Sequence, residues 1–111
     1  MESDYRHKER RRTMNNGKNI LITGASRGIG AALAKAFARE GYAFVGVNYF
    51  SDEPGAQTVA EEIRGAGAGA ALYQADVSSS ADCRRMLDSF IGDTGRIDVL
   101  INNAGGAQDI P

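Results

Sequence analysis

Four short apolar runs alternate with three stretches of helical hydrophobic spacing, and this alternation limits the fold more than any other feature of the sequence. Each run is short and is followed by glycine or polar residues, as expected for strands buried in a sheet. An alternation of strand and helix favours right-handed crossovers and a parallel sheet. The chain is therefore predicted to have an α/β fold, with strands at residues 19–23, 43–49, 70–74 and 99–102.

A doubly wound arrangement would place these four strands in the order 3-2-1-4, with the first two helices on one face of the sheet and the third on the other. In such a sheet, ligands bind at the carboxyl ends of the strands, where the strand order reverses. That point lies between the first and fourth strands. The glycine-containing turns after Thr23 and after Asn103 are therefore expected to lie in the same crevice.

The predicted helices have recognisable ends and apolar faces. Asp52 is an expected N-cap with Pro54 in the first turn, and Ser79 and Asp82 have the spacing of a capping box. Gly41 is expected just after the end of the first helix. Residues spaced three and four apart predict the buried faces: Ile29, Ala32, Leu33, Ala36 and Phe37 in the first helix, Ala56, Val59, Ala60 and Ile63 in the second, and Cys83, Met86, Leu87, Phe90 and Ile91 in the third.

Length and charge predict one domain preceded by a basic arm. A chain of 111 residues is about the size of a single domain. Residues 1–18 hold six of the 13 Lys and Arg but only three of the 14 Asp and Glu. We expect residues 1–17 to form a flexible arm, with Met14 as an alternative start of translation, and residues 18–111 to form the domain. The arm has no aromatic platform beyond Tyr5 and the rest of the chain is acidic, which disfavours binding to nucleic acid.

Several classes of protein are disfavoured by the composition. The single cysteine, Cys83, cannot form an internal disulfide or a cysteine-based metal cluster, and it is assigned with Met86 to core packing. His7 is the only histidine and lies in the arm, so a histidine mechanism has no candidate. No apolar run approaches the roughly 18 residues that span a membrane, and a secretory signal pattern is absent. A cytoplasmic location is therefore expected.

The segment from Thr23 to Gly30 carries the clearest functional signal. Its glycines lie between a buried strand and a helix, where they allow a sharp turn and the close approach of a ligand. The start of the helix offers unpaired N–H groups and a positive dipole end, which suit a pyrophosphate. The loop lacks the Gly-Lys-Ser/Thr of nucleotide hydrolases and the G-x-G-x-x-G spacing. A tight turn without a ligand is the structural alternative.

Three motifs resemble those of the short-chain dehydrogenase/reductase family. The Thr-Gly-x-x-x-Gly-x-Gly of this loop resembles the family's cofactor loop, Asn-Asn-Ala-Gly at residues 102–105 resembles its second signature, and Asp76-Val77 resembles its adenine-contacting pair. The resemblance covers roughly residues 18–108 and is closest to the 3-oxoacyl-[acyl-carrier-protein] reductase and glucose dehydrogenase type. It implies a partial Rossmann fold, a nicotinamide dinucleotide cofactor and hydride transfer to a carbonyl or from an alcohol. Full-length members of the family are usually homo-oligomers.

The resemblance also implies roles for single residues. The glycine loop would surround the pyrophosphate and the adenosine ribose, Asp76 and Val77 would hold adenine, and the end of the fourth strand would line the ribose and nicotinamide. Asn102 would brace the central strands. As alternatives, Ile29 is also a residue of the helix core, and Asp76 could stabilise its own turn. The predicted cofactor-binding residues are Gly24, Ser26, Arg27, Gly28, Ile29, Gly30, Tyr49, Asp76, Val77, Asn103, Ala104 and Gly105.

The choice of cofactor is predicted from charge at the end of the second strand. A carboxylate some 20 residues after the loop would bind the ribose 2′-hydroxyl of NAD and repel the 2′-phosphate of NADP. Tyr49 and Phe50 are not acidic, although Phe50 departs from the arginine that relatives of this type often have at this position. Arg27 can supply a cation, and a charge-assisted hydrogen bond to phosphate contributes about 1.5–3 kcal/mol. The sequence therefore predicts NADP over NAD.

The catalytic residues of the family are not found in the sequence. The family's reaction uses a serine and a tyrosine followed four residues later by lysine, but the residues four after Tyr5, Tyr42, Tyr49 and Tyr73 are Glu9, Gly46, Glu53 and Val77. The chain is therefore expected to be a fragment. It is either the cofactor half of an NAD(P)-dependent oxidoreductase or an inactive remnant that acts at most as a nucleotide-binding or interaction module. A carbonyl or alcohol substrate is expected only for a full-length form.

Overall fold

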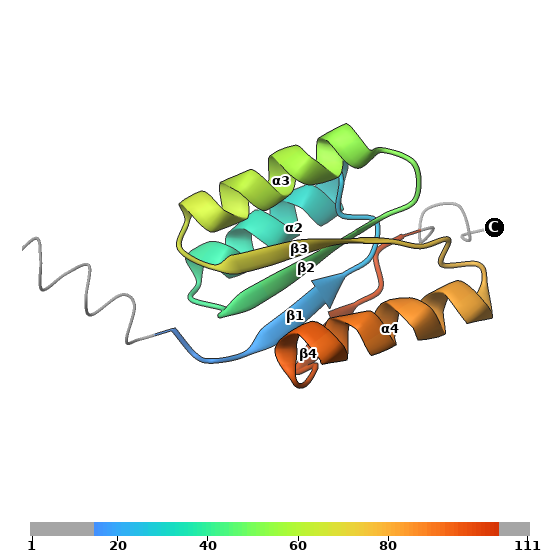
Figure 1. Ribbon diagram of the computed structural model, residues 1–111. Helices are drawn as coiled ribbons and strands as arrows, with labels where there is room; N and C mark the ends of the chain where they lie inside the picture. Colours follow the sequence, from blue (N-terminus) through green and yellow to red (C-terminus); the bar gives the residue numbers. More distant parts are fainter. Residues whose placement is uncertain (1–14, 105–111) are drawn as a thin grey trace, which may run out of the picture.

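A four-stranded parallel sheet with helices on both faces makes up residues 15–104, the part of the chain that the computed structural model describes (Figure 1). The strands lie in the order β3-β2-β1-β4. The predicted α/β class, strand order and partial Rossmann topology are therefore confirmed. The strands are β1 (Asn19–Ile22), β2 (Phe44–Tyr49), β3 (Gly69–Gln74) and β4 (Val99–Ile101), and the helices are α2 (Gly28–Arg39), α3 (Glu53–Gly65) and α4 (Ser80–Thr94).

The central strands are the most buried part of the molecule. All four residues of β1 are buried, and β1 pairs with β2 on one side and with β4 on the other. Leu21, for example, is opposite Gly46 of β2 and Leu100 of β4. Because β1 is buried on both faces, the three residues that follow Asn19 are all apolar.

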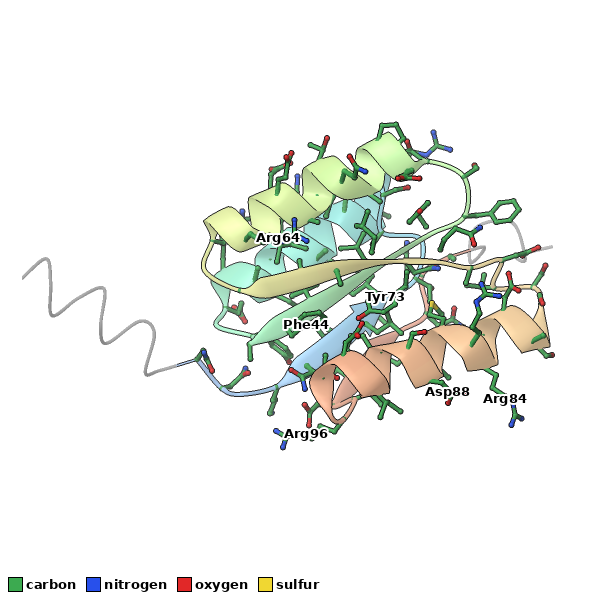
Figure 2. The ribbon with its side chains drawn as sticks, viewed as in Figure 1. Phe44, Arg64, Tyr73, Arg84, Asp88 and Arg96 are labelled. Carbon is green, nitrogen blue, oxygen red and sulfur yellow. The ribbon has the colours of Figure 1, made fainter. Side chains whose placement is uncertain are left out.

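The two faces of the sheet are covered by different helices, as predicted. Figure 1 shows α2 and α3 on one face and α4 on the other. The larger hydrophobic core lies under α2 and α3 and includes Ile22, Val47 and Ile63. The smaller core lies under α4 and is built around Phe90. Figure 2 shows the labelled Phe44 and Tyr73 directed from the sheet toward α4.

Most of the predicted helix ends are observed. The Asp52 side chain accepts a hydrogen bond from Gly55 N (3.1 Å), and Gly41 has a φ of 97° just after α2. Ser79 Oγ accepts a hydrogen bond from Asp82 N (3.2 Å), which is one half of the predicted capping box. The Asp82 carboxylate does not complete the box, because it accepts a hydrogen bond from Asp76 N (2.9 Å) and thereby fixes the turn after β3.

The predicted buried face of the first helix is only partly correct, because Leu33 and Phe37 pack against the core but the other three predicted residues are exposed. Ile29 is 73% exposed, and Ala32 and Ala36 are also exposed. Small residues face the sheet instead, because α2 lies close to the glycine loop and a large side chain would not fit there. The buried residues of α2 are Gly30, Ala31, Ala34 and Ala38, with Leu33 and Phe37 half-buried beside them.

The other two predicted faces agree better with the structure. The buried residues of α3 are the four that the spacing predicted. In α4, Met86 and Phe90 are buried, Cys83 and Leu87 are half-buried, and Ile91 is 41% exposed, so Ile91 lies at the margin of the predicted face. No helix within residues 15–104 has the length and apolarity needed to cross a membrane.

Candidate functional site

The loops that follow the carboxyl ends of the four strands lie at one edge of the sheet, and they bring the predicted motifs together. Thr23 follows β1, Asp76 lies just beyond β3, and Asn103 lies just beyond β4. In a doubly wound sheet this edge is where ligands bind. The contacts between these loops show how closely they are joined.

The hydroxyl of Thr23 connects the loop after β1 to the loop after β4. Thr23 Oγ1 accepts hydrogen bonds from Asn103 N (2.8 Å) and Ala104 N (2.9 Å). It also lies within donating distance of Ile101 O (3.4 Å) and Asn102 Oδ1 (3.3 Å). One buried hydroxyl therefore fixes the backbone of the second motif against the first.

The side chain of Asn103 makes a further bridge between the two motifs. Its Nδ2 donates a hydrogen bond to Gly24 O (3.1 Å). Asn102, which was expected to brace the central strands, contacts the Thr23 hydroxyl after β1, whereas Asn103 contacts the glycine loop itself.

The glycines of the loop are required by both space and backbone conformation. A Cβ on Gly24 would lie 2.9 Å from Ala104 Cα, and a Cβ on Gly30 would lie 2.7 Å from Asn103 Nδ2. Gly28 has a φ of 64°, in the left-handed region that favours glycine, and no atom lies within 4 Å of its Cβ position. The loop is thus closely packed on its inner side and open at Gly28.

The start of α2 is left open, unlike the starts of the other two helices. Asp52 and Ser79 cap α3 and α4, whereas no side chain within residues 15–104 caps α2 at Arg27. The first N–H groups of a helix have no partner within the helix and carry the positive end of its dipole. Arg27 and Ile29 are both exposed beside them. The open helix start, its dipole and the Arg27 cation together suit a phosphate-bearing ligand.

Asn48 is a site residue that the sequence analysis did not select. Its side chain is 1% exposed, and its Oδ1 accepts a hydrogen bond from Gly24 N (3.0 Å). Its Nδ2 donates to Tyr73 O (3.0 Å). The sequence did contain a signal for Asn48, because it is a polar residue in the otherwise apolar strand predicted at residues 43–49. A buried amide must find hydrogen-bond partners for both its oxygen and its nitrogen.

The turn after β3 is held by two aspartates. Asp76 Oδ1 accepts hydrogen bonds from Ser78 N (3.0 Å) and Ser78 Oγ (2.6 Å), so Asp76 does stabilise its own turn, as the alternative interpretation proposed. The hydrogen bond from Asp76 N and the nearby Arg85 guanidinium lower the pKa of the Asp82 carboxyl. Arg85 also donates to Gln74 O (3.0 Å), so α4 fixes both ends of this turn.

Tyr49 ends β2 beside the first turn of α3. Burial and the neighbouring Glu53 carboxylate raise the pKa of the Tyr49 hydroxyl. The phenol therefore remains protonated near neutral pH and can serve as a hydrogen-bond donor.

A cleft of about 510 Å³ opens at the carboxyl edge of the sheet. Four predicted residues line it, namely Gly24, Asp76, Val77 and Ala104. The cleft is also lined by Phe50, which is 62% exposed. Its wall on the α4 side consists of Cys83, Met86 and Leu87, and Leu100 of β4 adds to this apolar surface.

Eleven of the twelve predicted cofactor-binding residues lie in the described part of the chain, and all eleven are in loops or strand and helix ends at this edge. Those that do not line the cleft are Ser26, Arg27, Gly28, Ile29, Gly30, Tyr49 and Asn103. Gly105, the last predicted residue, lies outside the described residues, as do Met14 and His7. Within residues 15–104, no group of His, Cys, Asp and Glu is arranged to hold a metal ion.

The fold and this edge define a Rossmann-type protein, and comparison with known proteins gives its family. The family model described as short chain dehydrogenase matches residues 18–111. An oxidoreductase of Methylorubrum extorquens is 49% identical over 89 residues, which are 80% of this chain and 36% of the relative. The 3-oxoacyl-[acyl-carrier-protein] reductase FabG of Staphylococcus epidermidis is 41% identical over 92 residues, which are 83% of this chain and 37% of the relative.

Solved structures lead to the same family. A metagenomic short-chain oxidoreductase in complex with NADP matches with a TM-score of 0.74 and 37% identity, over 80% of this chain and 39% of that one. An NADH-dependent reductase complexed with NAD matches with a TM-score of 0.73 and 43% identity, over 81% of this chain and 37% of that one. The chain belongs to the short-chain dehydrogenase/reductase family. It spans little more than a third of the length of the curated relatives that it matches.

Proposed function

We propose that the chain binds a nicotinamide dinucleotide across the carboxyl edge of its sheet, as the cofactor-binding part of an oxidoreductase. The observation that carries this proposal is the uncapped start of α2, which opens beside a cleft bordered by the turns after β3 and β4. A bound dinucleotide would supply the hydride, or accept it, in the reduction of a carbonyl or the oxidation of an alcohol. The residues of this chain would bind and orient it.

The glycine loop is proposed to hold the pyrophosphate. The N–H groups at the start of α2, which no side chain within residues 15–104 caps, can donate to phosphate oxygens, and the left-handed Gly28 leaves the approach to them open. Gly24, Ser26 and Gly30 shape the loop around this position. The exposed Ile29 is proposed to be covered by the bound cofactor.

The two ends of the dinucleotide are proposed to lie on either side of this loop. Asp76 and Val77, which line the cleft beyond β3, are assigned to adenine. Tyr49 is assigned to the adenosine ribose. Asn103, Ala104 and Gly105 are assigned to the ribose and nicotinamide.

NADP is proposed as the preferred cofactor, with Arg27 as the residue that selects it. Arg27 is exposed at the N-cap of α2, and neither Tyr49 nor Phe50 offers a carboxylate that would repel a 2′-phosphate. An ion-assisted hydrogen bond to the phosphate is sufficient for a preference of about tenfold or more. Solved relatives are found with NADP and with NAD, so selectivity is assigned to this chain's own residues.

Titration calorimetry of the 111-residue chain with NADP⁺ and with NAD⁺ tests both parts of the proposal. The wild type is expected to bind NADP⁺ more tightly, and Arg27→Ala is expected to weaken NADP⁺ binding by about tenfold while NAD⁺ binding is retained. Arg39→Ala, a change of the same type in the last turn of α2, is the control and should alter neither. An unchanged ratio in Arg27→Ala would disprove the selection by Arg27. A wild type that binds neither nucleotide would disprove the proposed function.

Hydride transfer, substrate and assembly are proposed for a longer form of the protein. In this proposal residues 18–111 are the dinucleotide-binding domain, residues 1–17 are a basic arm, and the whole protein is a cytoplasmic homo-oligomer acting on a carbonyl or an alcohol. The coding sequence beyond Pro111 tests this directly. A continuation that encodes a serine and Tyr-x-x-x-Lys supports the oxidoreductase, whereas a stop codon favours a nucleotide-binding or interaction module without turnover.

A further inference from the structure

We infer that Asn48 is the positioning residue that fixes the glycine loop in its ligand-binding shape and couples it to the turn after β3. This inference rests on the proposed function, because it gives Asn48 a role in dinucleotide binding. Asn48 itself need not contact the nucleotide. Its effect is transmitted through the backbone of the loop.

The first two peptide units of the loop are both held by Asn48. Gly24 N donates to its side-chain oxygen (3.0 Å), and Ala25 N donates to its backbone oxygen (2.9 Å). No other residue of the described chain receives both N–H groups. The direction in which the loop leaves β1, and hence the position of the α2 start, depends on these two hydrogen bonds.

The other end of the same amide reaches the third strand. Asn48 Nδ2 donates to Tyr73 O (3.0 Å) and lies 3.4 Å from Ala75 O. Ala75 directly precedes Asp76, the first residue of the turn assigned to adenine. One side chain therefore joins the parts of the site proposed for the pyrophosphate and for adenine.

The surroundings of this amide admit few replacements. They present one N–H group on one side and three carbonyl oxygens on the other, those of Tyr49, Tyr73 and Ala75, so the side chain must both accept and donate. An asparagine does both. An ionised carboxylate could accept from Gly24 N but would place an unpaired negative oxygen against the three carbonyl oxygens. A protonated carboxyl could again accept and donate, as asparagine does.

This requirement makes Asn48→Asp a pH-controlled test. Burial and the three carbonyl oxygens are expected to raise the pKa of the introduced carboxyl above its usual range. The measurement is the Kd for NADP⁺, by calorimetry from pH 5.5 to pH 9, expressed as the ratio of variant to wild type at each pH. The ratio is expected to be near one at low pH and to rise to about tenfold as the carboxyl ionises. Asn15→Asp, the same change at an exposed residue before β1, is the control and should give a ratio near one throughout.

The effects of other charged and ionisable groups near the loop cancel when the ratio is taken. Asp76 and Cys83 line the same cleft, Asp82 binds the turn, Tyr49 adjoins Asn48, and Arg27 lies on the loop. These groups are the same in the wild type and in the variant. The 2′-phosphate, which also titrates, belongs to the ligand that is used with both proteins. A ratio that does not depend on pH overturns the inference. A wild type without affinity for NADP⁺ or NAD⁺ instead overturns the proposed function.

A second measurement decides the question if Asn48→Asp unfolds at high pH. In ¹⁵N-labelled protein without ligand, the Gly24 amide resonance of this variant should match the wild type at pH 5.5 and move away as the pH rises. The thermal unfolding temperature, followed in parallel, separates loss of loop position from loss of the fold. A Gly24 resonance in the variant that stays at the wild-type position up to the pH of unfolding contradicts the inference.

Discussion

The face of the sheet under α2 and α3 is packed with small side chains, whereas the face under α4 depends on aromatic rings. Six of the twelve buried residues in the first core are alanines. In the second core Phe90 lies 5.8 Å from Phe44 and 5.5 Å from Tyr73, measured between ring centroids, and both pairs meet edge to face. Figure 2 shows Phe44 and Tyr73 on this side of the sheet.

Glycines determine what each face can accept. On the α4 side, Gly46 of β2 makes room for the aromatic core, since a Cβ there would lie 2.7 Å from Phe90 Cε1. On the α2 side, Gly30 allows the helix to lie against the carbonyl of Gly24. The first face is therefore expected to be sensitive to added volume and the second to lost volume.

Phe90→Ala is expected to have the largest effect on stability. The ring is fully buried and contacts both other aromatic residues of its core, so its removal leaves a cavity. The free energy of unfolding should fall by about 3–5 kcal/mol, measured by urea denaturation followed by circular dichroism. Phe50→Ala removes the same ring from an exposed position and should change stability by no more than about 0.5 kcal/mol. If the two substitutions lower the free energy of unfolding equally, Phe90 does not make the large contribution to stability that is expected of it.

Ala34→Leu tests the opposite face with the opposite change. Ala34 is fully buried in α2, so the added atoms must displace the helix from the sheet. The expected loss is about 1–3 kcal/mol in the same denaturation experiment. Ala36→Leu, on the exposed side of the same helix, is the control and should be close to neutral. If Ala34→Leu is also neutral, the first face is not closely packed and the contrast between the faces disappears.

These small residues also explain where prediction from the sequence succeeded and failed. The α3 face was predicted correctly because Val59 and Ile63 are both apolar and large enough to define the stripe. The α2 face was predicted only in part, because hydrophobic spacing selects large residues such as Ile29 and gives little weight to alanine and glycine. Where a helix lies close to a loop, small residues rather than large ones face the sheet. This close approach can be seen only in the three-dimensional structure.

The site shows the same division between local and distant information. The glycine loop and Asp76 could be predicted, because strand ends and turn residues are local signals. The links made by Thr23 and Asn48 could not, since each joins segments 24 or more residues apart in the sequence. A buried hydroxyl or amide indicates that partners exist, but the sheet topology decides which they are.

Tyr73→Phe is expected to have the smallest effect at neutral pH, and it tests the α4 face without changing its volume. The phenol is 6% exposed and donates a hydrogen bond to Asp93 Oδ2 (2.7 Å). Loss of this hydrogen bond should lower stability by about 0.5–1.5 kcal/mol at pH 7, measured by urea denaturation. The aromatic contact with Phe90 is retained, so the result should lie well below that of Phe90→Ala.

The pH dependence of this variant separates the hydrogen bond from the packing of the ring. Burial and the Asp93 carboxylate raise the pKa of Tyr73 above the value of about 10 that a tyrosine has in an unfolded chain. The protonated phenol therefore stabilises the fold fully below about pH 10, and this contribution is lost as the pH rises above that value. The stability difference between wild type and Tyr73→Phe should be constant from pH 7 to pH 9 and then shrink above about pH 10. Tyr42→Phe removes a hydroxyl on the α2 side and is the control for general effects of alkaline pH. If the stability difference between wild type and Tyr73→Phe persists unchanged to pH 11, the Tyr73 hydroxyl does not hold α4 to the sheet.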